Sequence, residues 1–139
     1  MTTMDRQALT EFLARDFAQV AEQFAVEEVT AEGLVLRLCV AEGHLRPGGT
    51  VSGPAMFGLA DVAIYLTILS RIGPVALAVT TSATVDFLRK PAAGADLVCR
   101  TRLLKLGRSL AVADGLIEPA EGGAPVARVS MTYSIPPKG

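Results

Sequence analysis

The sequence predicts an α+β fold in which a curved antiparallel sheet wraps around one long buried helix. One internal segment is apolar on all sides, and four strand-like segments follow it with only short turns between them. Consecutive strands joined by short turns pair antiparallel, and a helix that is apolar all round must be covered on most sides. The length of 139 residues suits a single domain, which we expect to span residues 1–139.

An additional amphipathic helix is predicted at the N-terminus. Across residues 4–24, apolar side chains recur at steps of three and four, with charged side chains between them. Residues 26–30 and 34–41 then show the alternation expected of the two strands of a hairpin. We expect Gly33 in the turn to adopt a positive φ, which glycine tolerates without steric cost.

The apolar segment that follows predicts the central helix. A glycine- and proline-rich loop leads into a helix that begins near Pro54 and ends near Gly73. Ser52 or Gly53 is the expected N-cap, because the proline can then occupy the first turn. A membrane span is not expected, because the apolar run is short and contains Asp61.

Four predicted strands complete the sheet. They are rich in valine, leucine, threonine and alanine, and turn-forming residues separate them. Their ranges are residues 75–89, 95–106, 109–118 and 124–134. This order of elements is that of the hotdog architecture, in which the sheet curls around the helix.

The composition argues against several classes of function. A formal net charge of −1 argues against nucleic acid as the main partner. No spacing of histidine, cysteine or carboxylate residues is typical of a metal site, and we expect neither a metal nor a cofactor. Cys39 and Cys99 lie among alternating apolar residues, so we expect buried free thiols in a reducing, cytoplasmic environment.

Asp61 is the strongest candidate for a functional residue. It lies in the middle of the predicted central helix, among apolar neighbours. A buried carboxylate costs free energy unless it is hydrogen-bonded, paired or neutral. The sequence leaves two explanations open: Asp61 performs chemistry, or it has a structural role, in which it fixes a backbone turn or pairs with a basic residue across an interface.

Gly53, at the start of the same helix, is a second candidate. Backbone N–H groups at a helix N-terminus lack internal partners and can hold a carbonyl oxygen as it becomes an oxyanion. Gly53 precedes Asp61 by eight residues, which is about 12 Å along a helix axis. The two groups are therefore too far apart to act on one carbonyl within one chain, but a symmetric dimer can bring one beside the other.

The loop and helix also resemble a known family. The segment from Arg46 to Asp61 resembles the PaaI-like motif N-x-x-G-x-[VL]-H-G-G-x-x-x-x-L-x-D. The residues that match it in register are Gly49, Val51, Gly53, Leu59 and Asp61. Residues 86–92, 106–111 and 127–133 resemble later stretches of the same family.

This resemblance implies a hotdog thioesterase that hydrolyses acyl-CoA to free acid and CoA. In such a protein Asp61 is a general base or a nucleophile, and the Gly53 N–H polarises the thioester carbonyl across a dimer interface. Thr80 matches a position that orients water in some members. The resemblance further implies a homodimer or homotetramer.

The chain departs from the motif at three candidate substrate-binding positions. Arg46, Ser52 and Pro54 stand where the motif has asparagine, histidine and a second glycine. Ser52 retains a hydroxyl, and Arg46 could hold a carboxylated substrate. Two alternatives therefore stay open: a catalytically weak protein that binds acyl-CoA, and a hotdog dehydratase that uses His44 and Asp61.

Basic residues near the predicted strand ends are candidates for binding the phosphates of CoA. Arg89, Lys90 and Arg108 lie at such ends, where a phosphate contact is more plausible than in mid-strand. Aromatic residues make up only 5% of the chain, so the sequence predicts no stacking platform for an aryl acyl group.

Overall fold

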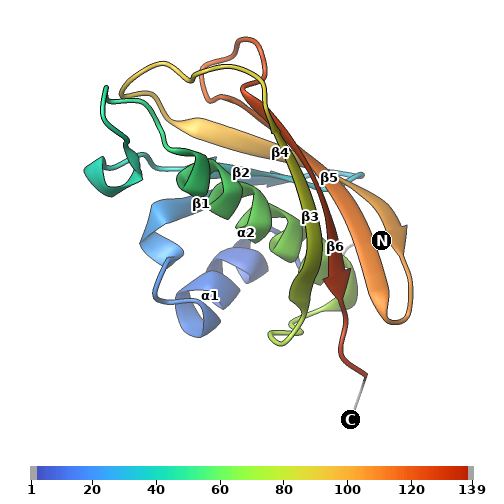
Figure 1. The fold of residues 1–139 in the computed structure, drawn as a ribbon. Coiled ribbons are helices and arrows are strands. Elements are labelled where there is room, and N and C mark those ends of the chain that lie inside the picture. The colour runs from blue at the N-terminus through green and yellow to red at the C-terminus, as the bar shows by residue number, and fades with distance from the viewer. Residues whose placement is uncertain (1–2, 138–139) are drawn as a thin grey trace.

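The computed structural model describes residues 3–137, and Figure 1 shows their arrangement. In chain order the elements are α1 (Arg6–Asp16), η1 (Ala21–Gln23), β1 (Phe24–Val29), β2 (Leu34–Leu38), η2 (Glu42–His44), α2 (Gly53–Ile72), β3 (Val79–Phe87), β4 (Leu97–Leu106), β5 (Leu110–Pro119) and β6 (Ala127–Ser134). The predicted hotdog architecture is confirmed: one antiparallel sheet curves around the long helix α2 (Figure 1).

The sheet has six strands in the order β1-β2-β4-β5-β6-β3. Strands β4, β5 and β6 pair with their neighbours in sequence, as predicted. Strand β3 does not pair with β4; it lies at the far edge and pairs with β6, with Ala83 opposite Met131. The segment from 88 to 96 carries the chain between the two strands. One edge of β3 is consequently left without a neighbour.

Helix α2 forms the centre of the core. The hydroxyl of Ser52 accepts a hydrogen bond from the Ala55 N–H at 3.2 Å, and Gly73 ends the helix with a φ of 94°. By length and apolar composition this helix could cross a membrane, but 67% of its most apolar window is buried inside the domain. The curved sheet buries the helix in this way. Each aliphatic side chain that becomes fully buried contributes roughly 1.5–3 kcal/mol to the free energy of folding.

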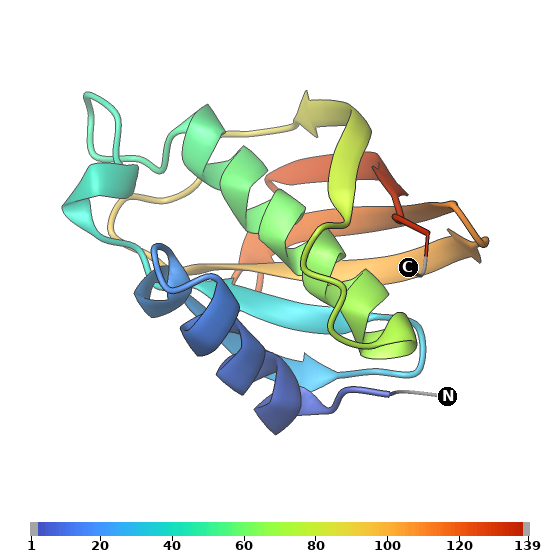
Figure 2. The same ribbon diagram turned by 90° about the horizontal axis from the view of Figure 1, so that it is seen from below.

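Helix α1 is shorter than predicted. It packs beside α2 and against β1 (Figure 2). Its buried residues are Leu9, Phe12 and Leu13. The helical periodicity across residues 4–24 continues past Asp16 only because the following turn also packs apolar side chains on the core. Phe17 has a φ of −131°, outside helical geometry, and ends the helix. The end of α1 and the residue after it are thereby placed beside α2.

Gly33 is required for a different reason from the one predicted. Its φ is not positive, whereas six other glycines do have positive φ. A Cβ atom at Gly33 would lie 2.3 Å from the carbonyl oxygen of Thr101 and 2.5 Å from its hydroxyl. The absence of a side chain therefore lets the β1–β2 turn approach β4 closely.

The two cysteines are free thiols. Cys99 is buried between α2 and the sheet, and burial raises its pKa to about 12, so it stays protonated. Cys39 is only half-buried, because it follows the last residue of β2 and leaves the covered face. The environment of Cys99 is therefore not that of a reactive thiolate.

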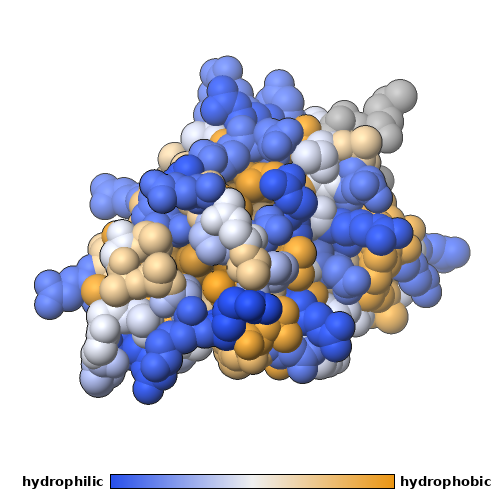
Figure 3. All heavy atoms as spheres, turned by 90° about the horizontal axis from the view of Figure 1, so that it is seen from above, coloured by the Kyte–Doolittle hydropathy of each residue, from blue (hydrophilic) through white to orange (hydrophobic). Residues whose placement is uncertain are grey.

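The outer surface is mixed in character. On the face seen in Figure 3, charged and polar side chains predominate and apolar atoms show between them in small groups. The large apolar side chains that are exposed include four along α2 and the β3 edge: Phe57, Val79, Phe87 and Leu88. These four residues, which we call the β3-edge patch, become relevant to assembly below.

We predict that Gly33→Ala lowers the free energy of unfolding by about 3 kcal/mol, because the new Cβ overpacks against the backbone of β4. Gly43→Ala is the matched control: nothing lies within 4 Å of its Cβ position, and we expect a change within about 0.5 kcal/mol. Chemical denaturation of both variants measures the difference. Equal stability of the two would contradict this explanation of Gly33.

Candidate active site

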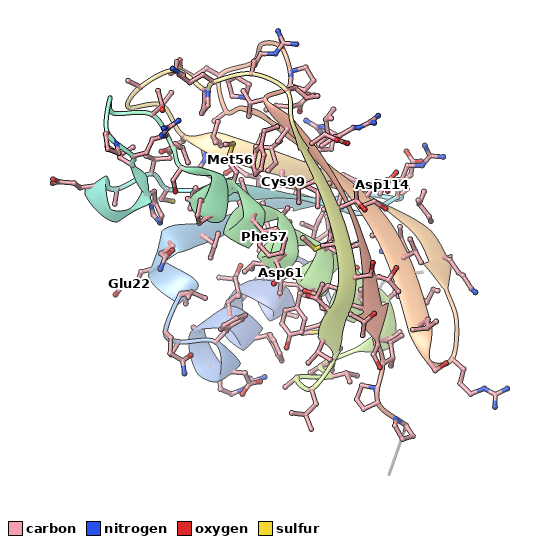
Figure 4. The ribbon with its side chains drawn as sticks, in the orientation of Figure 1. Glu22, Met56, Phe57, Asp61, Cys99 and Asp114 are labelled. Carbon is pink, nitrogen blue, oxygen red and sulfur yellow. The ribbon has the colours of Figure 1, made fainter. Side chains whose placement is uncertain are left out.

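Asp61 lies on the side of α2 that faces β3 and β6. Its Oδ1 accepts hydrogen bonds from the hydroxyl of Thr80 at 2.6 Å and from the phenol of Tyr133 at 2.5 Å. The same phenol lies 2.9 Å from the backbone oxygen of Asp61. Figure 4 shows Asp61 one turn beyond Phe57 on the same side of the helix. One carboxylate oxygen is thus fixed by two strands.

The second oxygen of Asp61 is available. Oδ2 has no hydrogen-bond partner in the part of the chain that the structure describes, and no side-chain nitrogen or oxygen there is both buried and unpartnered. Oδ2 must therefore be accessible. None of the ion pairs within residues 3–137 includes Asp61, so no basic side chain of the same chain pairs with it there.

Tyr133 is a site residue that the sequence reasoning missed. Burial raises the pKa of its phenol far above the usual value, and the charge of Asp61 raises it further, so the phenol remains a proton donor. Its inward-facing neighbours on β6 are Ala127, Val129 and Met131, all buried and apolar. A buried tyrosine hydroxyl needs a hydrogen-bond partner. A single tyrosine among inward-facing apolar residues was therefore the feature of the sequence that could have identified Tyr133 as a site residue.

A pocket of about 260 Å³ opens beside Asp61. We call it the Asp61 pocket, and its lining residues are Asp16, Phe17, Asp61, Val62, Tyr65, Ala76, Ala78, Val79, Thr80 and Tyr133. It lies between the end of α1, the middle of α2 and the start of β3. A carboxylate oxygen without a partner therefore meets a space that can admit a small group.

A larger hollow, of about 600 Å³, lies on the other face of the sheet. Asp114 belongs to it and points away from α2 (Figure 4). Its charged side chains largely pair with one another, as Arg128 does with Asp86 at 2.9 Å. None of the candidate site residues lines it, so we place the site at the smaller pocket.

The N-terminus of α2 offers one free backbone donor. The N–H groups of Ala55 and Met56 are both bonded to Ser52, and Pro54 has no N–H. Within residues 3–137 the N–H of Gly53 has no acceptor. A Cβ atom at Gly53 would touch the ring of Phe87 at 3.4 Å, so this donor lies beside the end of β3.

The remaining candidates are dispersed within one chain. Arg46 is exposed in the loop, where its N–H bonds the oxygen of Thr50. The Arg89 guanidinium donates to the oxygen of Pro125 at 2.8 Å, and Lys90 is exposed beside it. Arg108 lies in the β4–β5 turn, at the opposite end of the sheet.

Both ring nitrogens of His44 are engaged. Nδ1 accepts from the Ala41 N–H at 2.9 Å, and Nε2 lies 3.0 Å from the amide oxygen of Gln23. Because Nδ1 accepts from a backbone N–H, Nε2 is the nitrogen that donates to Gln23, and both nitrogens have partners within the chain. The geometry therefore gives His44 a structural role.

Within the described chain, no group of three histidine, cysteine, aspartate or glutamate side chains lies close enough to hold a metal ion. The chain offers one oriented carboxylate, one free backbone donor and a pocket beside the carboxylate. That combination suits attack on a carbonyl group.

Known proteins share this fold. The family described as "Thioesterase superfamily" matches residues 48–126. A protein of Silicibacter sp. TM1040, provisionally named a thioesterase, is 50% identical with a TM-score of 0.92, and the match covers 99% of this chain and 95% of that chain. No curated protein sequence matches.

Two further solved structures are similar. The phenylacetic acid degradation protein PaaI of Thermus thermophilus is 26% identical with a TM-score of 0.73, over 86% of this chain and 99% of that one. A hypothetical thioesterase of Streptococcus pneumoniae, solved with coenzyme A, is 21% identical with a TM-score of 0.76, over 94% and 98% of the two chains. With its curved sheet, central helix and matched segment, this chain belongs to the thioesterase superfamily as a PaaI-like hotdog domain.

Proposed function

We propose that the protein hydrolyses acyl-CoA thioesters to the free acid and CoA. The observation that carries this proposal is the Asp61 carboxylate, with Oδ1 held by two hydroxyl groups and Oδ2 open to a pocket. The structure of the S. pneumoniae relative with coenzyme A supports the choice of a CoA ester.

The complete site is formed by two chains. In one chain Asp61 contacts Thr80 near the start of β3, while Gly53 lies against Phe87 at its end. Antiparallel pairing of two β3 edges, centred near Ala83, brings the start of one strand beside the end of the other. The partner's Gly53 then lies beside Asp61, and the exposed β3-edge patch becomes covered.

The reaction follows from this arrangement. The N–H of the partner's Gly53 donates to the thioester oxygen and stabilises the negative charge that develops there. Asp61 Oδ2 removes a proton from a water molecule whose oxygen attacks the carbonyl carbon, or it attacks that carbon directly. The tetrahedral intermediate then collapses, the carbon–sulfur bond breaks and the CoA thiolate leaves. After attack by water the product is the free acid; after direct attack it is a mixed anhydride with Asp61, which a water molecule then hydrolyses to the free acid and the regenerated carboxylate.

The same pairing explains where CoA binds. Arg89 and Lys90 lie at the end of the sheet opposite Arg108 within one chain. In the antiparallel dimer, the partner's Arg89 and the partner's Lys90 come to the end of the sheet that carries Arg108. Arginine and lysine side chains there suit the phosphates of CoA.

A catalytically weak acyl-CoA-binding protein is the second candidate. The observation that favours it is the loss of motif side chains at Arg46 and Ser52, the latter being occupied as a helix cap. Pro54 also removes one backbone donor from the helix start. Turnover measurements separate the two candidates.

We predict that Asp61→Asn lowers kcat/KM by at least about 100-fold, because the amide can neither accept the proton of water nor act as a nucleophile. Release of free thiol from a panel of acyl-CoA esters measures the effect. Asp114→Asn, which removes a carboxylate on the other face of the sheet, is the control and should retain full activity. Binding of CoA esters without turnover by the unaltered protein would favour the second candidate.

Complementation between two inactive variants tests the shared site. Gly53→Pro removes the free N–H at a position where helices tolerate proline, and we expect it to be as inactive as Asp61→Asn. Random mixing of the two variants should restore about a quarter of the normal activity, because half of the dimers are mixed and each contains one intact site. No recovery on mixing, or a monomer in solution, would contradict the two-chain site.

Tyr133→Phe should lower kcat by roughly 10–100-fold with little change in KM, because a hydrogen bond to a charged group contributes about 1.5–3 kcal/mol. The phenol acts by orienting the carboxylate, and phenylalanine keeps the ring that lines the pocket, so binding should persist. Thr101→Val is the control: it also removes a buried hydroxyl, but one that bonds Leu34 and Thr67 instead of Asp61. An equal loss of kcat in both variants would show a general structural effect.

A further inference from the structure

The Asp61 pocket has an apolar, partly aromatic wall. Beside the carboxylate it is lined by Val62, Ala76, Ala78 and Val79, with rings at its end. A water molecule occupies about 30 Å³ of liquid, so 260 Å³ holds on the order of nine water-sized groups. The space beyond the reacting carbonyl is therefore small.

The aromatic end of the pocket is fixed in place. The phenol of Tyr65 donates to the oxygen of Ala76 at 3.0 Å. Its ring meets Phe17 edge-on with centroids 6.0 Å apart, and stacks on Tyr133 at 6.1 Å. Phe17, the residue at which α1 ends, therefore lines the pocket beside a ring that is itself held in place.

This arrangement corrects one expectation from composition. Although aromatic residues make up only 5% of the chain, both of its tyrosines and one of its five phenylalanines gather at this pocket. The low aromatic content therefore does not describe the site.

The pocket is also electrostatically one-sided. Its lining contains two carboxylates, Asp16 and Asp61, and no lysine, arginine or histidine. Arg15 reaches Asp16 at 3.4 Å, but its side chain is 64% exposed and it does not line the pocket. An acyl group that carries its own carboxylate would be repelled by this wall, and the Arg46 of the same chain does not line the space.

The position of Asp16 is unfavourable for α1 itself. It is the last residue of that helix, where the helix dipole favours a basic side chain and disfavours an acid. A residue that opposes the local preference of its helix calls for another reason to be there, and the adjoining pocket supplies one.

We propose that the C-terminal end of α1 selects the acyl group: Phe17 limits its length and Asp16 excludes negative charge. The substrates are then CoA esters of short, uncharged carboxylic acids. This inference rests on the proposed thioesterase function and adds the substrate class. Both residues lie outside the segment from 48 to 126 that matches the family.

The test compares the protein and two variants on butanoyl-, dodecanoyl- and succinyl-CoA. The unaltered protein should prefer butanoyl-CoA to the other two esters. Phe17→Ala should raise kcat/KM for dodecanoyl-CoA relative to butanoyl-CoA at least 10-fold. Asp16→Lys should raise the succinyl-to-butanoyl ratio to a similar extent, and a lysine at that helix end should leave the protein folded.

Two matched controls accompany these variants. Phe24→Ala removes a half-buried phenylalanine that does not line the pocket, and Glu11→Lys makes the same charge change on an exposed position of α1. Neither should alter the ratios between esters. Ratios that stay the same in Phe17→Ala and Asp16→Lys, while every protein hydrolyses butanoyl-CoA, would overturn the selection proposal alone.

Failure of the proposed function would look different. If the unaltered protein releases no thiol from any ester, hydrolysis is excluded, and calorimetric binding of the same esters then tests selection. The Kd ratios between esters should shift in Phe17→Ala and Asp16→Lys as described for kcat/KM. Unchanged Kd ratios would overturn selection in that case as well.

Discussion

The architecture of the site depends on how one carboxylate is accommodated in an apolar helix. Asp61 interrupts the most hydrophobic segment of the chain, where an unsatisfied charge would be costly. Thr80 and Tyr133 supply two hydrogen bonds to one of its oxygens. Because these donors come from β3 and β6, the site requires β3 to lie beside β6. The same two hydrogen bonds hold Oδ1 and thereby leave Oδ2 as the oxygen without a partner.

The proposed reaction then follows from the length of a helix. Gly53 and Asp61 are separated by two turns of α2, and these turns run beside the length of β3. A rigid helix cannot bring its own free N–H to its own carboxylate, so the proposed chemistry needs two chains. In the proposed dimer, pairing along β3 would join complementary half-sites twice, once at each end of the strand.

Local patterns predicted those features that depend on local chemistry. The central helix, its Ser52 cap and the isolated carboxylate were all indicated by residue type and spacing, and the hotdog architecture is confirmed. The place of β3 beside β6 was not, because strand pairing order is set by long-range contacts. Tyr133 and Phe17 were missed for the same reason: each reaches the site from an element distant in sequence. Gly33 was noted, but its steric role depends on Thr101, 68 positions away.

The unpaired edge of β3 has a consequence for the life of the protein in solution. An exposed edge strand is a template for uncontrolled association, and proteins usually blunt such edges with charges or prolines. The side chains of β3 are mostly small, hydroxylated or apolar, and its single charge, Asp86, lies near one end. Dimer formation through this edge would remove that hazard and complete the site together. A substitution that weakens the pairing of the two β3 edges would then lower both solubility and activity. Aggregation and loss of turnover would have the same cause.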